Sequence, residues 1–167
     1  MIAIRRATPD DAEQVHAMLL AMLKEPIVNI PLAPDELRTL DEQRTSMVDL
    51  ASSERAALFV AVEGKAIAGE LTIQPISTRR ALLHVATLGI TVAREWRGRG
   101  VGSALIAAGL EFARTAGYKR VELVVYARNT AAIGLYEKHG FVREGVRRGL
   151  IREGDSYLDD ILMARVD

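Results

Sequence analysis

The sequence contains no cysteine, which excludes disulfide bonds and thiolate catalysis and is typical of a reducing compartment. It has 22 lysines and arginines against 22 aspartates and glutamates, so no overall charge favours a nucleic acid or a membrane surface as partner. No apolar run reaches membrane-spanning length, and the N-terminal segment MIAIRRATPDDAEQ turns polar before a signal-peptide core could form. We therefore expect a cytoplasmic protein that binds any anionic ligand at a local site.

The chain has enough apolar material for one core. It contains 167 residues, of which 49% are hydrophobic, and this size fits a single domain. No internal repeat, linker or low-complexity segment interrupts it. We expect one α/β domain over residues 1–167.

Periodicity and turn signals predict the order strand, two helices, three strands, helix, strand, helix, two strands. The segment 27–34 is rich in proline and predicts an irregular loop, a candidate lid over a substrate. The predicted strands are 3–6, 56–62, 66–76, 82–92, 120–126, 141–152 and 156–166, and the predicted helices are 9–24, 35–51, 103–116 and 129–140.

The stretch EWRGRGVGSAL, residues 95–105, places three glycines at alternate positions in front of a predicted helix. Glycines let backbone N–H groups turn toward one point and let a ligand approach without meeting a Cβ atom. The helix adds unpaired amides and the positive end of its dipole. The stretch therefore predicts an anion site, most naturally for a phosphate group. At about 1.5–3 kcal/mol for each charge-assisted hydrogen bond, several amides can hold a pyrophosphate without a basic protein.

Three other interpretations of this stretch compete with that one. A P-loop needs Gly-Lys followed by Ser or Thr, which the sequence lacks. A dinucleotide-binding G-x-G-x-x-G motif would place its third glycine at Ser103, and only one strand–helix–strand unit surrounds it. A purely structural role, as a tight turn and a close helix contact, stays open from this stretch alone.

Two ordered motifs resemble those of the GCN5-related N-acetyltransferases (GNAT). The segment RGRGVG, residues 97–102, matches the family signature R-x-x-G-x-G/A, and NTAAIGLYEKHGF, residues 129–141, resembles N-x-x-A-x-x-L-Y-E-K-x-G-F. The resemblance in element order extends over residues 2–166. The segments HV at 84–85, LGI at 88–90 and GDSYLDD at 154–160 are most similar to bacterial L-amino acid N-acetyltransferases.

This resemblance implies the GNAT fold, an α/β (α+β) architecture. It has a mixed seven-stranded central sheet flanked by four helices, with a V-shaped splay between strands 4 and 5. It also implies acetyl-CoA as cosubstrate, bound in the splay, and no metal. The phosphate groups would meet backbone amides between Arg97 and Gly102, and the pantetheine arm would pair with the strand edge at Ile90 and Val92. The residues implied to bind acetyl-CoA are Leu88, Ile90, Val92, Arg97, Gly98, Arg99, Gly100, Val101, Gly102, Ser103, Asn129, Ala132 and Tyr136.

By the same resemblance, the Tyr136 hydroxyl would donate a proton to the departing CoA sulfur. A phenol has a pKa near 10 and a model thiol a pKa near 8.5, so this transfer is uphill by about 1.5 units and Tyr136 would help without being essential. The alternative is that Tyr136 only packs on its helix face. Asn129 would likewise contact the CoA arm, cap its helix, or both.

The general base is less clearly indicated. Many relatives have a carboxylate two residues before the glycine of the L-G-I strand, where this chain has Thr87. Glu70, His84 or a water chain could serve instead. Without that carboxylate an α-amine, with a pKa near 8 in a peptide, is favoured over a lysine-like amine near 10.4. Asp159 and Asp160 could attract an ammonium group, although such residues, like the pair Arg147-Arg148, are usually solvated edge charges.

We therefore predict an enzyme that moves an acetyl group from acetyl-CoA to a primary amine of a small molecule, with amino acids as candidates, by direct attack in a ternary complex. One alternative is acetylation of a protein or peptide N-terminus. Two others are a CoA-binding regulatory module without turnover and a nucleotide-binding protein. A homodimer is expected only because dimers are common in the family, and no nucleic-acid or membrane partner is expected.

Overall fold

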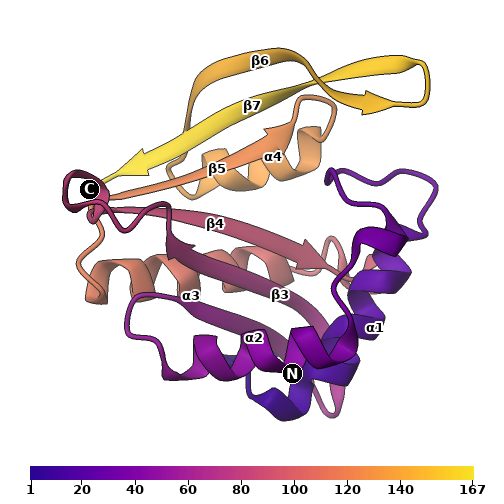
Figure 1. The fold of residues 1–167 in the computed structure, drawn as a ribbon, viewed down its shortest axis with the longest axis vertical. Coiled ribbons are helices and arrows are strands. Elements are labelled where there is room, and N and C mark those ends of the chain that lie inside the picture. The colour runs from indigo at the N-terminus through magenta and orange to yellow at the C-terminus, as the bar shows by residue number, and fades with distance from the viewer.

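The computed structural model describes residues 1–167 as one seven-stranded sheet with helices on both faces (Figure 1). The strand order is β1-β2-β3-β4-β5-β7-β6. The strands are β1 (Ala3–Arg6), β2 (Ala57–Glu63), β3 (Ala66–Pro75), β4 (Val85–Val92), β5 (Arg120–Tyr126), β6 (Val142–Glu153) and β7 (Ser156–Val166). The helices are α1 (Ala12–Leu23), α2 (Leu40–Ser52), α3 (Val101–Thr115) and α4 (Thr130–Lys138). The predicted seven-stranded sheet and the predicted four helices are confirmed. None of the helices is long and apolar enough to cross a membrane.

The sheet opens between β4 and β5. These two strands form the only parallel pair, and they pair only over Val85–Thr87 and Arg120–Glu122. Both strands continue well beyond this short ladder, and β4 stays paired with β3 along its other edge up to Val92. The predicted splay between strands 4 and 5 is therefore present.

Several predicted boundaries differ from the structure, and three of these differences have clear local reasons. The strand predicted at 82–92 begins at Val85, because Arg80–Leu82 form a 3-10 turn. The helix predicted at 35–51 begins at Leu40, because Thr39 forms a capping box with Glu42. The helix predicted from residue 103 begins two residues earlier, directly after a glycine in the left-handed conformation.

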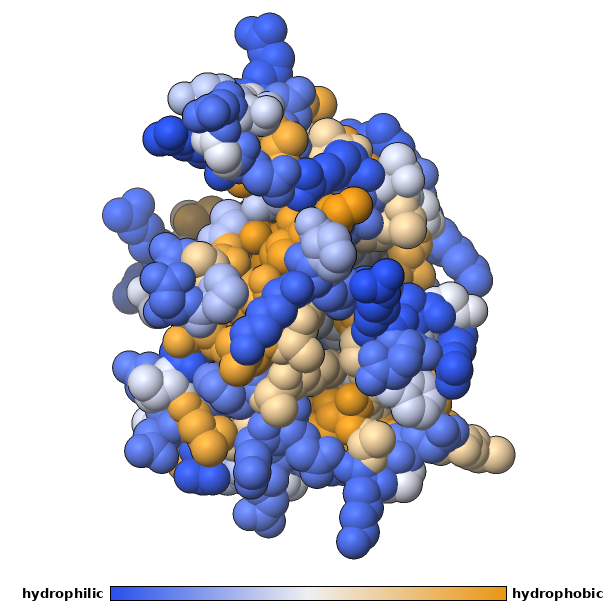
Figure 2. All heavy atoms as spheres, turned by 90° about the vertical axis from the view of Figure 1, so that its right-hand side faces the viewer, coloured by the Kyte–Doolittle hydropathy of each residue, from blue (hydrophilic) through white to orange (hydrophobic).

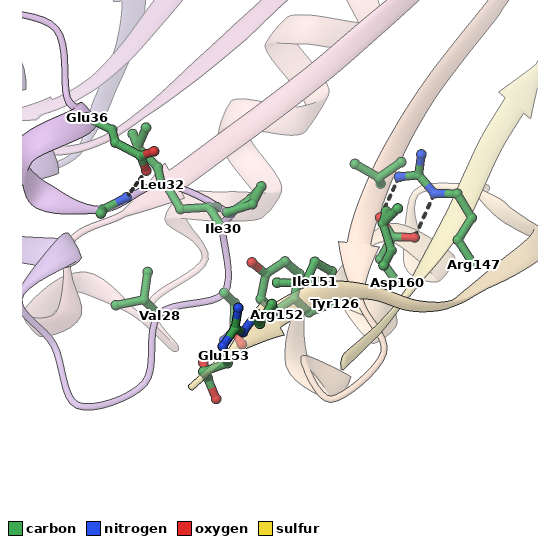
Figure 3. A pocket seen from close by; sticks show the side chains of 15 residues that line it. Val28, Ile30, Leu32, Glu36, Tyr126, Arg147, Ile151, Arg152, Glu153 and Asp160 are labelled. Atoms are coloured by element: carbon green, nitrogen blue, oxygen red, sulfur yellow. Dashed lines mark hydrogen bonds and ion pairs between the residues drawn. The ribbon is translucent and has the colours of Figure 1, made fainter. Parts of the chain in front are cut away.

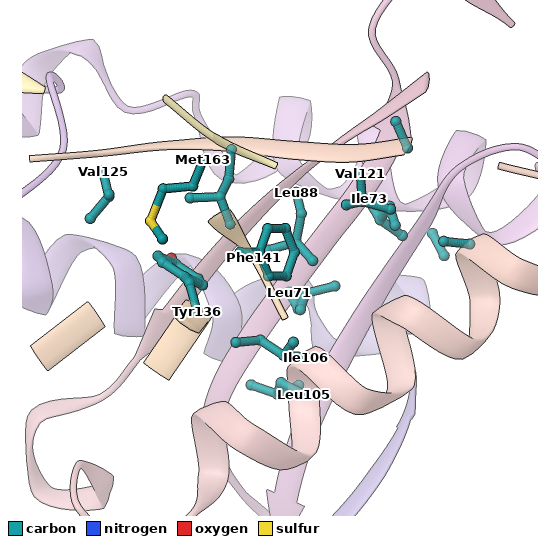
Figure 4. Close-up of a cluster of buried hydrophobic side chains, with 14 of the residues drawn as sticks. Leu71, Ile73, Leu88, Leu105, Ile106, Val121, Val125, Tyr136, Phe141 and Met163 are labelled. Carbon is teal, nitrogen blue, oxygen red and sulfur yellow. The ribbon is translucent and has the colours of Figure 1, made fainter. Parts of the chain in front are cut away.

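The two faces of the sheet carry separate cores. One core lies between the sheet and the pair α3 and α4, and it includes Leu71, Leu88 and Tyr136 (Figure 4). The other core lies between the sheet and the pair α1 and α2, and it includes Val60 of β2. Glu70 of β3 stands opposite Val60 in the β2–β3 register, so its side chain is on the α1 and α2 face.

Candidate active site

The glycine-rich segment forms the junction between β4 and α3. Gly98 and Gly100 have φ angles of +72° and +82°, and a Cβ atom at either position would meet nothing within 4 Å. Residues other than glycine rarely adopt this conformation. Gly102 is different, because a Cβ there would lie 2.8 Å from the Leu135 Cδ2 atom of α4. Two of the glycines therefore shape an open loop, and the third lets α3 approach α4.

The backbone N–H groups of this loop have no partners. Every N–H from Gly98 through Ser103 lacks an acceptor within the chain, and the next one, that of Ala104, donates to the Gly100 carbonyl at 3.0 Å. The Arg97 amide donates to the Arg94 carbonyl at 3.3 Å, so the free amides begin at Gly98 and not at Arg97 as expected. Together with the positive end of the α3 dipole, these amides form an anion site.

The free edge of β4 lies beside this loop. The Val85 carbonyl and the Ala93 amide bond to the chain on the β3 side. Backbone groups of a strand point alternately to its two edges, so Leu88, Ile90 and Val92 direct theirs toward the splay. Since β5 does not pair beyond this short ladder, this row can pair with an extended ligand arm, apart from the Val92 carbonyl, which accepts from Arg97 Nε.

Two arginines anchor the connection between α1 and α2. Arg97 forms a bidentate ion pair with Glu25 at 2.7 and 2.8 Å, and its Nε donates to the Val92 carbonyl at 3.0 Å. Arg128 Nε donates to Asn29 Oδ1 at 2.9 Å. The segment that begins with Glu25 is thus tied to the glycine loop at one point and to the end of β5 at another.

Two cavities adjoin this connecting segment, and the lid expected at residues 27–34 stays a prediction. One has a volume of about 690 Å³ and is lined in part by Arg147, Glu153 and Asp160 (Figure 3). The other, which we call the polar cavity, has a volume of about 490 Å³ and contains Glu70. Ile30, Leu32 and Glu36 line both cavities. Figure 2 looks at the side of the molecule where the segment runs, and hydrophobic side chains gather across the hollowed middle of this mostly hydrophilic face.

Glu70 is an unpaired carboxylate in the polar cavity. It projects from β3 beside Thr91 of β4, and it makes no hydrogen bond or ion pair within the chain. Protein surrounds the carboxyl group, yet some of its surface stays accessible because it faces the cavity. This burial raises the pKa of Glu70 to about 7, and the charge of Arg38 opposes the rise. A carboxylate with this pKa can accept a proton near neutral pH.

Tyr136 lies on the other face of the sheet. Its ring is buried edge-on against Phe141, with 5.9 Å between the ring centroids (Figure 4). Its hydroxyl makes no hydrogen bond within the chain, but it is not sealed in, because the only fully buried side-chain polar atom without a partner is His16 Nδ1. Burial raises the pKa of Tyr136 to about 12, so the phenol stays protonated and can donate a hydrogen bond.

Free amides at a helix N-terminus beside an open strand edge are the parts that the two sequence motifs implied. Residues 23–141 match the sequence profile of the acetyltransferase (GNAT) family. The chain belongs to this family. The resemblance stated from the motifs is therefore confirmed, and the chain is an N-acetyltransferase by family.

Several relatives of the GNAT family are similar over much of the chain. The Escherichia coli L-amino acid N-acetyltransferase AaaT is 36% identical over 110 residues, which cover 65% of this chain and 67% of that protein. A GNAT acetyltransferase from Streptococcus pneumoniae has a TM-score of 0.92 and 30% identity, with 100% of both chains covered. A Sinorhizobium meliloti phosphinothricin acetyltransferase, solved in complex with acetyl-CoA, shares the fold at 18% identity. Its TM-score is 0.86, and the match covers 99% of this chain and 88% of that one.

The other residues proposed for catalysis or for acetyl-CoA binding lie in separate parts of the structure. His84 is exposed just before β4, at the opposite end of that strand from Thr91 and roughly 20 Å from Glu70 along it, so the structure does not bring the two bases together. Asn129 caps α4 by accepting from the Ala132 amide at 3.2 Å. Ser103 lies within hydrogen-bond distance of His139, with 2.7 Å between its Oγ and Nε2.

The expectation of solvated charges on the last hairpin is wrong for one pair. Asp160 is buried, and its two oxygens accept from Arg147 Nε at 2.8 Å and Nη2 at 2.5 Å. Asp159 accepts from the Gly149 amide at 2.8 Å. Both carboxylates are therefore engaged within the chain, and Asp160 in particular is not a free attractor for an ammonium group.

Two residues of the polar cavity were not predicted from the sequence. Arg38 precedes α2, and Gln43 lies in its first half with only 6% of its surface exposed. The pattern of this helix is mostly polar, and nothing local distinguishes a buried glutamine from a solvated one. Only the position of α2 over the sheet identifies them.

Proposed function

We propose that this chain transfers the acetyl group of acetyl-CoA to a primary amine of a small molecule, by direct attack in a ternary complex, within one domain of residues 1–167. The carrying observation is that the free amides from Gly98 to Ser103 lie at the mouth of a splay, while the unpaired Glu70 opens into a cavity on one face of the same sheet. The E. coli relative, whose name gives L-amino acids as its substrates, supports a small acceptor.

The residues present fit acetyl-CoA as cosubstrate. Its pyrophosphate would take the amides from Gly98 to Ser103, where no Cβ of Gly98 or Gly100 stands in the way. Its pantetheine arm would pair with the free edge at Leu88, Ile90 and Val92, which directs the thioester into the splay. Asn129 and Ala132, at the start of α4, would lie along this arm.

Glu70 and Tyr136 would act from opposite faces of the sheet. Glu70 takes a proton from the substrate ammonium, directly or through a water, and the freed nitrogen bonds to the thioester carbonyl carbon while the C–S bond breaks. The nitrogen loses its second proton to water as the amide forms, and the released CoA thiolate takes up a proton from water. With a phenol pKa of about 12 against about 8.5 for a thiol, full proton transfer from Tyr136 is uphill by roughly 5 kcal/mol. We therefore assign Tyr136 a hydrogen bond to the developing thiolate.

Replacing Tyr136 with phenylalanine should lower kcat by about 10- to 100-fold, the effect expected of one hydrogen bond to a charged group. The KM for acetyl-CoA and the melting temperature should stay nearly unchanged, because the hydroxyl has no partner within the chain. Initial rates at saturating amine and a thermal melt measure these quantities. Full activity in the variant would remove Tyr136 from the reaction.

Release of free thiol from acetyl-CoA across amino acids, peptides, polyamines and aminoglycosides tests the proposal itself. We expect release with at least one small primary amine. Release with peptides alone would favour N-terminal acetylation, and CoA binding without release for any amine would favour a regulatory module. Heat stabilisation by NAD and not by CoA would contradict the proposed acetyl transfer and also both of these alternatives. The cytoplasmic location and the homodimer stay predictions.

A further inference from the structure

The polar cavity contains two opposite charges that do not pair. Glu70 lines it from β3, and Arg38 lines it from the segment that leads into α2. Neither side chain makes an ion pair or hydrogen bond within the chain, yet the charge of Arg38 lowers the pKa of Glu70 against the effect of burial. The two groups are therefore within electrostatic reach but too far apart to neutralise each other. Two other carboxylates are already engaged: Glu42, near Arg38, by the Thr39 capping box, and Glu36, which also lines the cavity, by the Ala33 amide, which donates to it at 2.8 Å.

A buried amide in the same cavity also lacks a partner. Gln43 is 6% exposed, and its side-chain amide makes no hydrogen bond within the chain. Its polar atoms are nevertheless not sealed in, because His16 Nδ1 is the only fully buried side-chain atom without a partner. The Gln43 amide therefore faces the cavity space. A buried polar group without a partner costs stability, which makes a ligand the natural partner for it.

Resting on the proposed function, we propose that Arg38 and Gln43 bind the α-carboxylate of a free amino acid whose ammonium group faces Glu70. An α-amino acid carries its ammonium group and its carboxylate on the same α-carbon, so one molecule can satisfy both unpaired groups at once. A guanidinium matches a carboxylate with two parallel hydrogen bonds, and a carboxamide N–H can donate a third. Arg38 thereby becomes the residue that selects free amino acids over simple amines and peptides.

The rest of the cavity indicates the kind of amino acid. Its volume of about 490 Å³ fits a small ligand. Half of the residues that line it are apolar, and most of these come from α1, α2 and β2. These apolar residues include Leu19, Met22, Leu23, Leu50 and Leu58. We therefore expect an apolar substrate side chain to lie against this wall.

The test compares three amino acids, L-leucine, L-methionine and L-phenylalanine, each with its own amide, which keeps the amine and removes the carboxylate charge. Arg38→Gln should raise the KM of the preferred amino acid by about 10- to 100-fold, as loss of a charge-assisted contact implies, and leave that of its amide within about twofold. Arg44→Gln is the matched control, because Arg44 lies on α2, pairs with Asp41 and does not line the cavity. The lower amine pKa of an amide affects all variants equally, so the ratio between variants isolates Arg38. Arg38→Lys should restore part of the loss.

The outcomes separate this inference from the proposed function. If Arg38→Gln raises the KM of the amino acid and of its amide equally, or raises neither, the carboxylate site is overturned. The same holds for a wild-type enzyme that acetylates none of the three amino acids while another amine of the wider panel reacts; in each case acetyl transfer itself stands. Failure of every amine would instead refute the proposed function. A thermal melt of Arg38→Gln should match the wild type, because the Arg38 side chain is exposed and bonded to nothing.

Discussion

Gly100→Asp should raise the KM for acetyl-CoA by about 100-fold or more and leave the chain folded. Gly100 is the N-cap residue of α3, so an aspartate there would place a carboxylate beside the first free amides of the helix. These amides include those of Gly102 and Ser103, which are free for the pyrophosphate. The new carboxylate would both occupy the amides and repel the phosphate charge. Initial rates at saturating amine, with acetyl-CoA varied, measure the effect.

Gly64→Asp provides the matched control. Gly64 has φ +61° in the turn between β2 and β3, and a Cβ there would also meet nothing within 4 Å. The two substitutions impose similar backbone strain, but only Gly100 lies at the free amides. Gly100→Ala further separates strain from charge and should raise the KM much less than Gly100→Asp. A folded Gly100→Asp variant with unchanged affinity for acetyl-CoA would contradict the assignment of these amides.

The free amides of the glycine loop could be predicted from the sequence, but the separate roles of its glycines could not. Alternate glycines before an amphipathic helix predicted free amides, and the structure has them from Gly98 onward. The sequence could not separate the roles of the glycines, because the constraint on Gly102 comes from Leu135, which is distant in the chain and meets it only through the packing of α4 on α3. The close helix contact of the structural interpretation is therefore found at Gly102, while Gly98 and Gly100 leave open space beside the free amides.

Candidate charges were harder to place from the sequence. Glu70 and His84 lie in the two strands predicted at 66–76 and 82–92, and only the β3–β4 register puts Glu70 beside Thr91 and His84 at the far end of that strand pair. Arg147 and Asp160 look like solvated residues, but a register shift after Arg147 accompanies their cross-strand pairing. Such long-range registers depend on irregularities that local patterns do not encode.

Glu70→Gln should lower kcat/KM at pH 7 by about 100-fold or more, the usual contribution of a general base. In the wild type, the reactive form has an ionised Glu70 and an ammonium substrate, so kcat/KM should rise with pH up to about 7 and then level off. In the variant only the free amine reacts, and kcat/KM should keep rising up to the pKa of the amine. The deficit should therefore shrink by roughly tenfold for each pH unit above 7.

Stability supplies a second readout for Glu70 that does not depend on turnover. Because burial raises its pKa from 4.5 to about 7 in the folded chain, the folded state holds a proton that the unfolded state has lost between these values. The stability contributed by Glu70 is thus complete below pH 4.5 and is lost as pH rises through 7. The neutral side chain of Glu70→Gln carries no such penalty, so the variant should gain on the wild type between pH 5 and pH 8, by roughly 1–3 kcal/mol in the free energy of unfolding.

Two controls decide whether Glu70 is the base. Glu63→Gln removes a carboxylate from the neighbouring strand β2, outside both cavities, and should change neither the pH profile of kcat/KM nor its pH 7 value. His84→Ala should also keep the bend near pH 7, because His84 lies at the far end of β4. If the bend instead disappears in His84→Ala and persists in Glu70→Gln, the base is His84 and Glu70 serves only to attract the ammonium group. If it persists in both, the proton leaves through water, and the raised pKa of Glu70 reflects burial in a cavity with no role in proton transfer.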